Sequence, residues 1–201
     1  MQSSNNKIVN EIKSKRRGML IFAKDFALLG TDYAIRHSLS RLCKDGAIVR
    51  LSPGIYLYPK LDGDGEVILP TVNEIMAQIM RRDKAKIVPT GLYALNALGL
   101  STQVPMRLVF LTDGAARVLK IGKLQIKLQK TVAKNLSYRS DVCCLAVFAL
   151  KEIGKGKATE EELQKIYIAL SHENSDIITH DALLAPNWIS TILLHYLRTR
   201  K

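Results

Sequence analysis

A tight hairpin that directly follows a basic helix is the feature that most constrains the fold of this chain. Residues 47–58 read AIVRLSPGIYLY, in which two apolar runs with strand character flank Ser52, Pro53 and Gly54. Proline and glycine in succession interrupt a strand and favour a turn. The sequence therefore predicts two short strands that are joined by a turn at these three residues.

A helix is predicted immediately before this hairpin. Thr31 or Asp32 is a suitable N-cap, because a short polar side chain there can accept a hydrogen bond from a free backbone N–H of the first turn. Ile35, Leu39 and Leu42 recur at the spacing of one helix face and should be buried. The outward positions carry polar and aromatic side chains, namely Tyr33, Arg36, His37, Ser40, Arg41 and Lys44.

Two further helical segments are predicted upstream. Residues 7–15 place apolar side chains at helical spacing, and residues 23–30 read as a two-turn helix that ends at Gly30. Helix, short helix, helix and hairpin within about 60 residues is the order of a winged helix-turn-helix, a DNA-binding module. The first predicted domain is therefore a winged helix-turn-helix at residues 1–60.

The fold class predicted for the whole chain is α+β, with a second domain at residues 71–201. The segment 61–70, LDGDGEVILP, is rich in Gly and Asp and ends in Pro, which is typical of a linker. Apolar periodicity then predicts helices at 72–82, 92–98, 141–153, 160–170 and about 189–197, a buried strand at 106–114 and a basic hairpin at 117–130. Thr159 and Glu162 have the spacing of a capping box. The second domain is thus expected to be mixed, with a small β-sheet and a helical C-terminal half.

Positive charge is concentrated in the first two thirds of the chain. The 201 residues include 30 Lys and Arg against 18 Asp and Glu, a net charge of +12. Residues 1–60 hold 11 basic and four acidic side chains, whereas residues 141–201 hold seven and eight. Each phosphate that a basic side chain neutralises releases condensed counterions, and this distribution therefore favours a nucleic-acid partner.

The sequence offers little for metal or cofactor chemistry, and we expect neither. The four histidines show no HExxH spacing, the adjacent Cys143 and Cys144 cannot form a CxxC knuckle, and no nucleotide-binding glycine motif occurs. His172 and His180 flank ENSDIIT, which we interpret as a polar loop. No apolar run reaches the ~20 residues that a membrane-spanning helix needs. Three cysteines make a poor disulfide framework and indicate the cytoplasm.

An enzymatic alternative rests on Asp113, Gln125 and Lys127. Restriction-type nucleases place an Asp at the end of one strand and an acid-x-Lys pattern on a later one, and Gln125 stands here where the second carboxylate belongs. One carboxylate holds Mg²⁺ poorly. The simpler interpretation is a turn at Asp113 and Gly114, with Lys127 on a solvated basic face. We therefore predict that the protein is not an enzyme.

Two segments resemble the AbiEi-family antitoxins of bacterial toxin–antitoxin and phage abortive-infection systems. SLSRLCKDGAIVRLSPGIYLYP, residues 38–59, resembles the winged helix at the N-terminus of those proteins. VPTGLYALNALGLSTQVPMRLVFLTDG, residues 88–114, resembles the start of the second domain in a short branch of the group. The likeness extends over residues 7–130, and the C-terminal helices lie outside it.

The resemblance implies a transcriptional repressor that binds inverted repeats in double-stranded DNA of its own promoter. It also implies that the second domain counters a nucleotidyltransferase-type toxin encoded nearby, which in the type IV scheme need not be bound directly. DNA contact would then fall to the helix and the wing, through Thr31, Tyr33, Arg36, His37, Ser40, Arg41, Lys44, Arg50, Ser52 and Gly54. The basic hairpin at 117–130 would extend the phosphate track.

A third possibility is a protein-interaction adaptor without DNA binding. Helix-turn-helix cores also occur in such modules, where the outer helix face only keeps the protein soluble. The helical C-terminal region would then bind the partner. The sequence predicts no oligomeric state.

Overall fold

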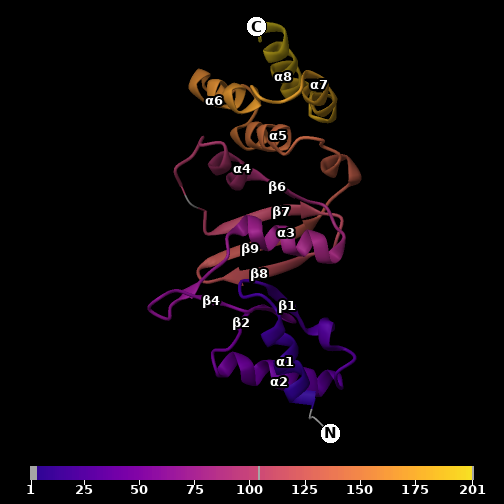
Figure 1. Ribbon diagram of the computed structural model, residues 1–201. Coiled ribbons are helices and arrows are strands. Elements are labelled where there is room, and N and C mark those ends of the chain that lie inside the picture. Colours follow the sequence, from indigo (N-terminus) through magenta and orange to yellow (C-terminus); the bar gives the residue numbers. More distant parts are fainter. Residues whose placement is uncertain (1–3, 104, 201) are drawn as a thin grey trace. The chain divides into compact units, whose positions relative to one another are not determined.

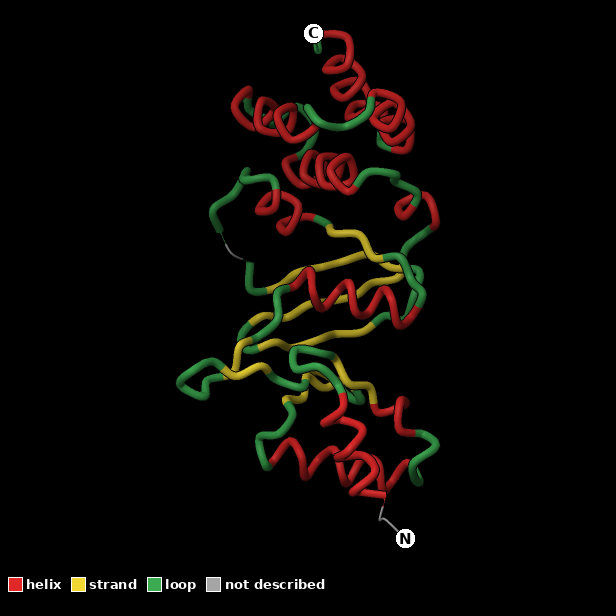
Figure 2. Tube along the Cα trace, in the orientation of Figure 1, coloured by secondary structure: helices red, strands yellow, loops and turns green. Residues whose placement is uncertain are grey.

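The computed structural model describes residues 4–103 and 105–200, which form a mixed α+β fold of helices and small sheets (Figures 1 and 2). The chain divides into two compact units. The N-terminal unit comprises Met1–Arg82 together with Leu119–Ile121, and the C-terminal unit comprises Asp83–Val118 together with Gly122–Lys201. The α+β class predicted from the sequence is confirmed.

The N-terminal unit is built around one apolar cluster. Its helices are α1 (Ser4–Ser14), the 3-10 helix η1 (Ala23–Phe26), α2 (Asp32–Lys44) and α3 (Val72–Asp83). Ile8 and Ile12 of α1 pack with Phe26, Ile35 and Leu39, which lie on η1 and α2. The two-turn helix expected at 23–30 is shorter than predicted, because the chain makes a single 3-10 turn that ends at the buried Phe26.

Three short strands complete this core. They are β1 (Leu20–Phe22), β2 (Val49–Ser52) and β3 (Ile55–Leu57), in the order β1-β3-β2 with antiparallel pairing. All three residues of the central strand β3 are buried, and Tyr56 belongs to the same apolar cluster as the helices. The hairpin predicted around Ser52–Gly54 is therefore confirmed as β2 and β3.

Helix α3 belongs to the N-terminal unit. The Gln78 side chain accepts a hydrogen bond from Leu20 N at 2.7 Å and donates one to Gly18 O at 3.2 Å. The Arg82 guanidinium lies 3.8 Å from the centroid of the Phe22 ring. These contacts place the helix with residues before position 60, whereas the domain bounds predicted from the sequence put it in the second domain. The boundary between the compact units falls after Arg82.

Where the sequence predicts a linker, at residues 61–70, the chain forms a small hairpin. Strands β4 (Lys60–Leu61) and β5 (Val67–Ile68) pair antiparallel as a two-stranded sheet. The Asp62 carboxylate accepts hydrogen bonds from Asp64 N at 3.0 Å and Glu66 N at 2.8 Å, which fixes the turn. We call residues 60–69 the β4–β5 ribbon; it extends outward from β1 and β2 of its own unit (Figure 1).

The sheet of the C-terminal unit mixes parallel and antiparallel pairs. Its strands are β6 (Ile87–Pro89), β7 (Arg107–Thr112), β8 (Arg117–Ile121) and β9 (Leu124–Lys130), in the order β6-β7-β9-β8. β6 is antiparallel to β7, and β7 is parallel to β9 with Leu108 opposite Ile126. The predicted strand and the predicted basic hairpin are both present; residues 119–121 of that hairpin group with the N-terminal unit.

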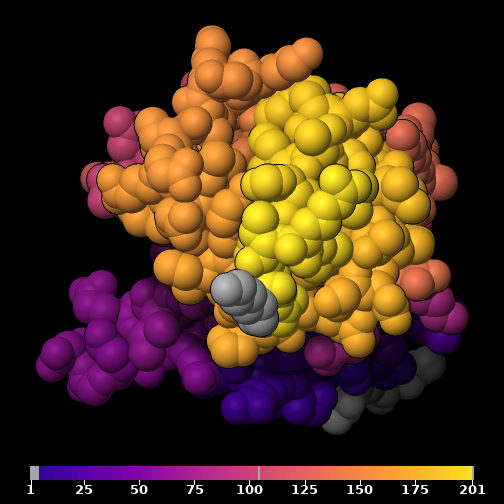
Figure 3. All heavy atoms as spheres, turned by 90° about the horizontal axis from the view of Figure 1, so that it is seen from above, coloured from indigo at the N-terminus to yellow at the C-terminus, as the bar shows by residue number. Residues whose placement is uncertain are grey.

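The rest of the C-terminal unit is helical. It contains α4 (Gly91–Ala97), the 3-10 helix η2 (Ala133–Leu136), α5 (Asp141–Ile153), α6 (Glu160–Leu170), α7 (Ser175–Leu184) and α8 (Asn187–Thr199). α5 is buried on most sides, with Val147 and Leu150 in the cluster that α6, α7 and α8 share. Figure 3 shows α8 in yellow beside the orange α6. The rings of Tyr167 on α6 and Tyr196 on α8 stack with their centroids 4.7 Å apart.

One predicted cap is confirmed and one predicted loop is wrong. Thr159 Oγ1 accepts from Glu162 N at 3.2 Å while the Glu162 carboxylate accepts from Thr159 N at 2.8 Å, a capping box. The segment interpreted as a polar loop between two histidines is instead the start of α7, with Asn174 as its N-cap. Ser175, Asp176 and Thr179 of that segment are exposed helix positions, and a buried acidic residue, Asp181, obscures the apolar period.

Two buried thiols predict a loss of stability at alkaline pH. Burial raises the pKa of Cys143 and Cys144 to about 12, from an ordinary value of 9.0. Below pH 9.0 both thiols are neutral in the folded and unfolded chain, and their effect on stability is constant. As the pH rises from 9.0 toward 12, the unfolded chain ionises first, and the free energy of unfolding should fall.

Urea unfolding measures this effect when it is followed by the fluorescence of Trp188, the single tryptophan, which packs against the C-terminal core. In a Cys143→Ala/Cys144→Ala variant the alkaline decline should be shallower than in the wild type. An equally steep decline in both chains would show that the thiols do not cause it.

Candidate nucleic-acid interface

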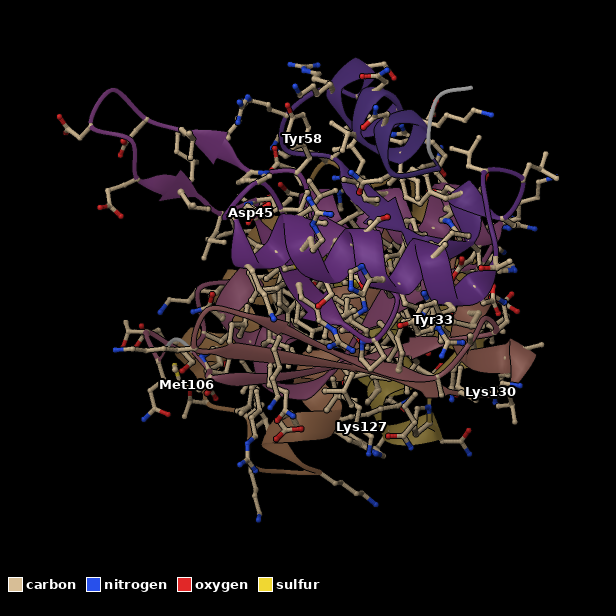
Figure 4. The ribbon with its side chains drawn as sticks, turned by 90° about the horizontal axis from the view of Figure 1, so that it is seen from below. Tyr33, Asp45, Tyr58, Met106, Lys127 and Lys130 are labelled. Carbon is tan, nitrogen blue, oxygen red and sulfur yellow. The ribbon has the colours of Figure 1, made fainter. Side chains whose placement is uncertain are left out.

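Helix α2 presents a polar outer surface because its apolar residues all turn inward. Thr31 is the N-cap, and its hydroxyl accepts a hydrogen bond from Ala34 N at 3.3 Å. Ile35 and Leu39 are buried in the core of the unit. Figure 4 shows the helix lengthwise, from Tyr33 near its start to Asp45, the residue after its end. All polar positions predicted to face outward are exposed: Tyr33, Arg36, His37, Ser40, Arg41 and Lys44.

One row of these side chains lines a groove. Arg36, Ser40 and Lys44 are spaced four residues apart and therefore share one side of α2. They line a concave surface that encloses a volume of about 800 Å³. Its other wall includes Arg50 and Gly54 of the β2–β3 hairpin. We call this surface the α2 groove. Basic side chains thus stand on both of its walls, which is the electrostatic arrangement that an anionic backbone needs.

The hairpin wall of the α2 groove is fixed in place. The register between β2 and β3 shifts between Arg50 and Ser52, which marks a bulge just before the turn. Gly54 adopts φ +74°, a conformation that favours glycine. Its carbonyl accepts a hydrogen bond from Ala23 N at 2.9 Å, which ties the turn to η1. The turn is therefore short. It is held by the paired strands on both sides and by the hydrogen bond at its tip.

Cys43 and Tyr56 also line the α2 groove, and Arg50 affects both of them electrostatically. Burial raises the pKa of the Cys43 thiol, and the nearby Arg50 guanidinium partly opposes that rise. Burial likewise raises the pKa of Tyr56, with Arg50 again acting in the opposite direction. Both groups are therefore neutral at physiological pH, and neither adds a negative charge to the groove.

A second row on α2 lies beside the groove. Tyr33, His37 and Arg41 are also four residues apart, and the rings of Tyr33 and His37 stack with centroids 6.2 Å apart. Tyr33 is 79% exposed, which is unusual for so large a ring. This row offers an aromatic surface and a guanidinium to the same side of the N-terminal unit.

The structure brings most of the sequence-predicted residues together and adds one that sequence reasoning missed. Of the predicted set, Arg36, Ser40, Lys44, Arg50 and Gly54 line the groove. Thr31 caps α2, Tyr33, His37 and Arg41 form the second row, and Ser52 is half-buried in β2. Lys24 of η1 also lines the groove. The only sign of this position in the sequence is that a basic residue occurs in the short helix before α2.

One acidic residue is part of the same surface. Asp32 lines the α2 groove and lies 3.7 Å from the Arg36 guanidinium, in an exposed pair one turn apart. An exposed pair of this kind contributes at most about 1 kcal/mol, so it does not hold Arg36 away from a ligand.

The residues of the nuclease alternative do not converge. The register of the parallel strands sets Lys127 opposite Val109, four residues before Asp113. At 3.3 Å per residue that is a separation of ~13 Å along the sheet. The Asp113 carboxylate accepts a hydrogen bond from Lys86 N at 2.8 Å. The acid therefore holds a backbone turn, and the lysine stands apart from it.

The described residues contain no group of three or more His, Cys, Asp or Glu side chains placed to bind a metal ion. His180 Nδ1 lies 2.8 Å from Asp181 Oδ1, and that carboxylate is otherwise occupied by backbone donors. Within the same described ranges, no helix is both long and apolar enough to cross a membrane.

Fold and surface together define a two-unit α+β protein with a basic groove on its N-terminal unit. The chain belongs to the family of unknown function DUF6088, whose model matches residues 7–178. No curated protein matches it. A crystal structure of the RV2827C protein from Mycobacterium tuberculosis is similar at 13% sequence identity, with 95% of this chain and 80% of that chain covered. The TM-score is 0.46, a level at which two chains need not share a fold.

Proposed function

We propose that the N-terminal unit is a winged helix-turn-helix and that the protein is a DNA-binding repressor of antitoxin type. The observation that carries the proposal is the α2 groove, in which Arg36 and Lys44 on the helix face Arg50 on the hairpin. The order of α1, η1, α2 and the β2–β3 hairpin supports it, since that order is the one in which such modules present a recognition helix.

Both rows on α2 contribute to two roles in this proposal, which differ by position along the helix. Arg36, His37 and Ser40 lie near the middle of the exposed face and read base edges in the major groove, where Arg pairs with guanine and Ser with several bases. Tyr33, Arg41, Lys44 and Arg50 bind phosphates on either side, which positions the helix without reading sequence. Thr31, Ser52 and Gly54 contact the backbone at the two ends.

The antitoxin part of the proposal rests on the resemblance of residues 38–59 and 88–114 to AbiEi-family antitoxins. On that basis the protein represses its own promoter through inverted repeats, and the C-terminal unit counters a nucleotidyltransferase-type toxin encoded nearby. A neighbouring gene for such a toxin, and relief of its toxicity on co-expression, would support this part separately from DNA binding.

Fluorescence anisotropy with the DNA upstream of the protein's own gene tests the proposal. The wild type should bind this DNA more tightly than a scrambled duplex, and the affinity should fall steeply as salt rises. Replacing Arg41 by alanine should weaken binding to both duplexes alike and reduce the salt slope by about one. Replacing Arg36 by alanine should reduce discrimination between the duplexes, by about 1–3 kcal/mol.

The exposed Lys155, on the α5–α6 turn, provides the matched control, and its replacement by alanine should change neither measurement. If the Arg36→Ala/Arg41→Ala double variant binds with the wild-type affinity and salt slope, α2 is not the DNA-binding helix. If the wild type itself does not distinguish the duplexes at any salt concentration, the chain is not a sequence-specific DNA-binding protein.

A further inference from the structure

Along the β4–β5 ribbon, acidic, apolar and basic side chains follow one another from the tip to the base. Three acidic residues occupy the tip, Asp62, Asp64 and Glu66, and residues 61–70 contain no basic side chain. Four apolar side chains follow behind them, and each is substantially exposed: Leu61 at 47%, Val67 at 40%, Ile68 at 47% and Leu69 at 42%. Leu61 pairs with Val67 directly behind this acidic tip and forms the apolar middle, whereas Ile68 pairs with Lys60 at the base of the ribbon.

A basic pocket lies at the base of the ribbon. It has a volume of about 320 Å³ and is lined by Ile68 and Leu69 of the ribbon and by residues of α3 and of the turn after α1. Its cationic side chains are Arg16, Arg17, Lys60 and Arg81. Among its described lining residues the single acid is Glu74, whose carboxylate accepts hydrogen bonds from Thr71 N at 2.8 Å and Thr71 Oγ1 at 2.9 Å.

Among the described residues, no further strand pairs with the β4–β5 ribbon. β4 and β5 pair with each other in a two-stranded sheet, so each has a free edge among the described strands. Two-stranded hairpins are marginally stable in water unless they pack against another element. Exposed edges and apolar strips of this kind are usually covered by a partner.

The order of acidic, apolar and basic groups makes the ribbon complementary to an inverted copy of itself. We propose that two copies of the chain associate through their β4–β5 ribbons, antiparallel about a two-fold axis, with the acidic tip of each in the basic pocket of the other. Four residues separate Asp64 at the tip from Lys60 at the base, ~13 Å of extended chain. When two ribbons lie side by side and antiparallel, the tip of each therefore meets the base of the other. The two apolar middles then lie against each other.

A second copy is the occupant that the charges favour. Two molecules with a net charge of +12 repel each other, and a local region of opposite sign offsets that repulsion. The acidic tip provides that region within the basic first two thirds of the sequence. A two-fold interface is self-complementary by definition, which is the property that this charge order has. The inference does not depend on DNA binding, since it concerns the protein alone.

Sedimentation equilibrium of the full-length protein, without DNA and at low salt, tests the proposal. The wild type should form dimers that weaken as salt rises. Reversal of the tip (Asp64→Lys/Glu66→Lys) or of the base (Lys60→Glu/Arg81→Glu) should each weaken self-association at least about tenfold. Asp62 is retained in the tip variant because its carboxylate forms the turn.

Mixing the two variants gives the decisive result. In the tip-reversed chain, the tip and the pocket at the base of the ribbon are both positively charged. In the base-reversed chain, both are negatively charged. Each repels itself, but the two together should form a heterodimer, because every tip then meets a base of opposite sign. Circular dichroism of each variant alone establishes that it is folded.

Lys155→Glu/Lys157→Glu, which reverses two exposed charges in the C-terminal unit, is the control for net charge and should dimerise like the wild type. A wild type that stays monomeric up to about 100 µM would overturn the proposal. Dimers that survive both reversals, or two folded variants that fail to pair with each other, would also overturn it, since the contact would then lie elsewhere.

Discussion

A chain that carries Lys44→Glu and Arg50→Glu should bind DNA at least about a hundredfold more weakly than the wild type. The two side chains stand on opposite walls of the α2 groove. Reversal of both charges replaces attraction by repulsion wherever the phosphate backbone approaches either wall. The loss should therefore exceed that of the Arg36→Ala and Arg41→Ala variants, and it should be the same for specific and scrambled DNA.

The matched control for this experiment is Lys155→Glu/Lys157→Glu, which makes the same change in net charge outside the groove. Anisotropy titrations at several salt concentrations separate the local effect from the general one, since a general effect appears equally in both variants. If both variants lose the same affinity, the groove has no special role and only the net charge of the protein matters.

Replacement of Asp181 by alanine should lower the free energy of unfolding of the C-terminal unit by about 3 kcal/mol. The Asp181 side chain is fully buried and accepts hydrogen bonds from Arg139 N at 3.0 Å and from Ser140 N at 3.0 Å. Ser140 is the N-cap of α5, and its hydroxyl accepts in turn from Val142 N and Cys143 N. Loss of the carboxylate leaves two backbone donors unpaired at the start of the most buried helix.

Urea unfolding followed by Trp188 fluorescence measures the loss. Asp181→Asn should be less harmful, because one amide oxygen can still accept a hydrogen bond from the backbone. Asp176→Ala, on the exposed first turn of the same helix, is the matched control and should cost less than about 1 kcal/mol. An Asp181→Ala chain as stable as this control would show that the buried hydrogen bonds contribute little.

The features that were predicted correctly from the sequence are those that depend on local patterns. The exposed face of α2 follows from the spacing of Ile35, Leu39 and Leu42, and the hairpin follows from Pro53 and Gly54. Both signals act within a few residues and are strong, because helix periodicity and turn chemistry leave few alternatives. The polar row along α2 was therefore predictable residue by residue.

What the sequence did not reveal depends on contacts between distant segments. Gln78 joins α3 to β1 across 58 residues of sequence, and no local pattern indicates that bond. Lys24 reaches the groove only because η1 packs beside α2. The ribbon was interpreted as a linker because its Gly and Asp residues are equally common in loops and in tight hairpin turns.

The hydrogen bond between Gly54 O and Ala23 N has a consequence for the thermodynamics of binding. A hairpin tip that is already held to η1 loses little conformational freedom when a ligand enters the α2 groove. The ordering entropy that flexible wings lose on binding is, in this chain, already lost during folding. Calorimetry should accordingly record a heat-capacity change that reflects surface burial alone, without the additional term that accompanies coupled folding.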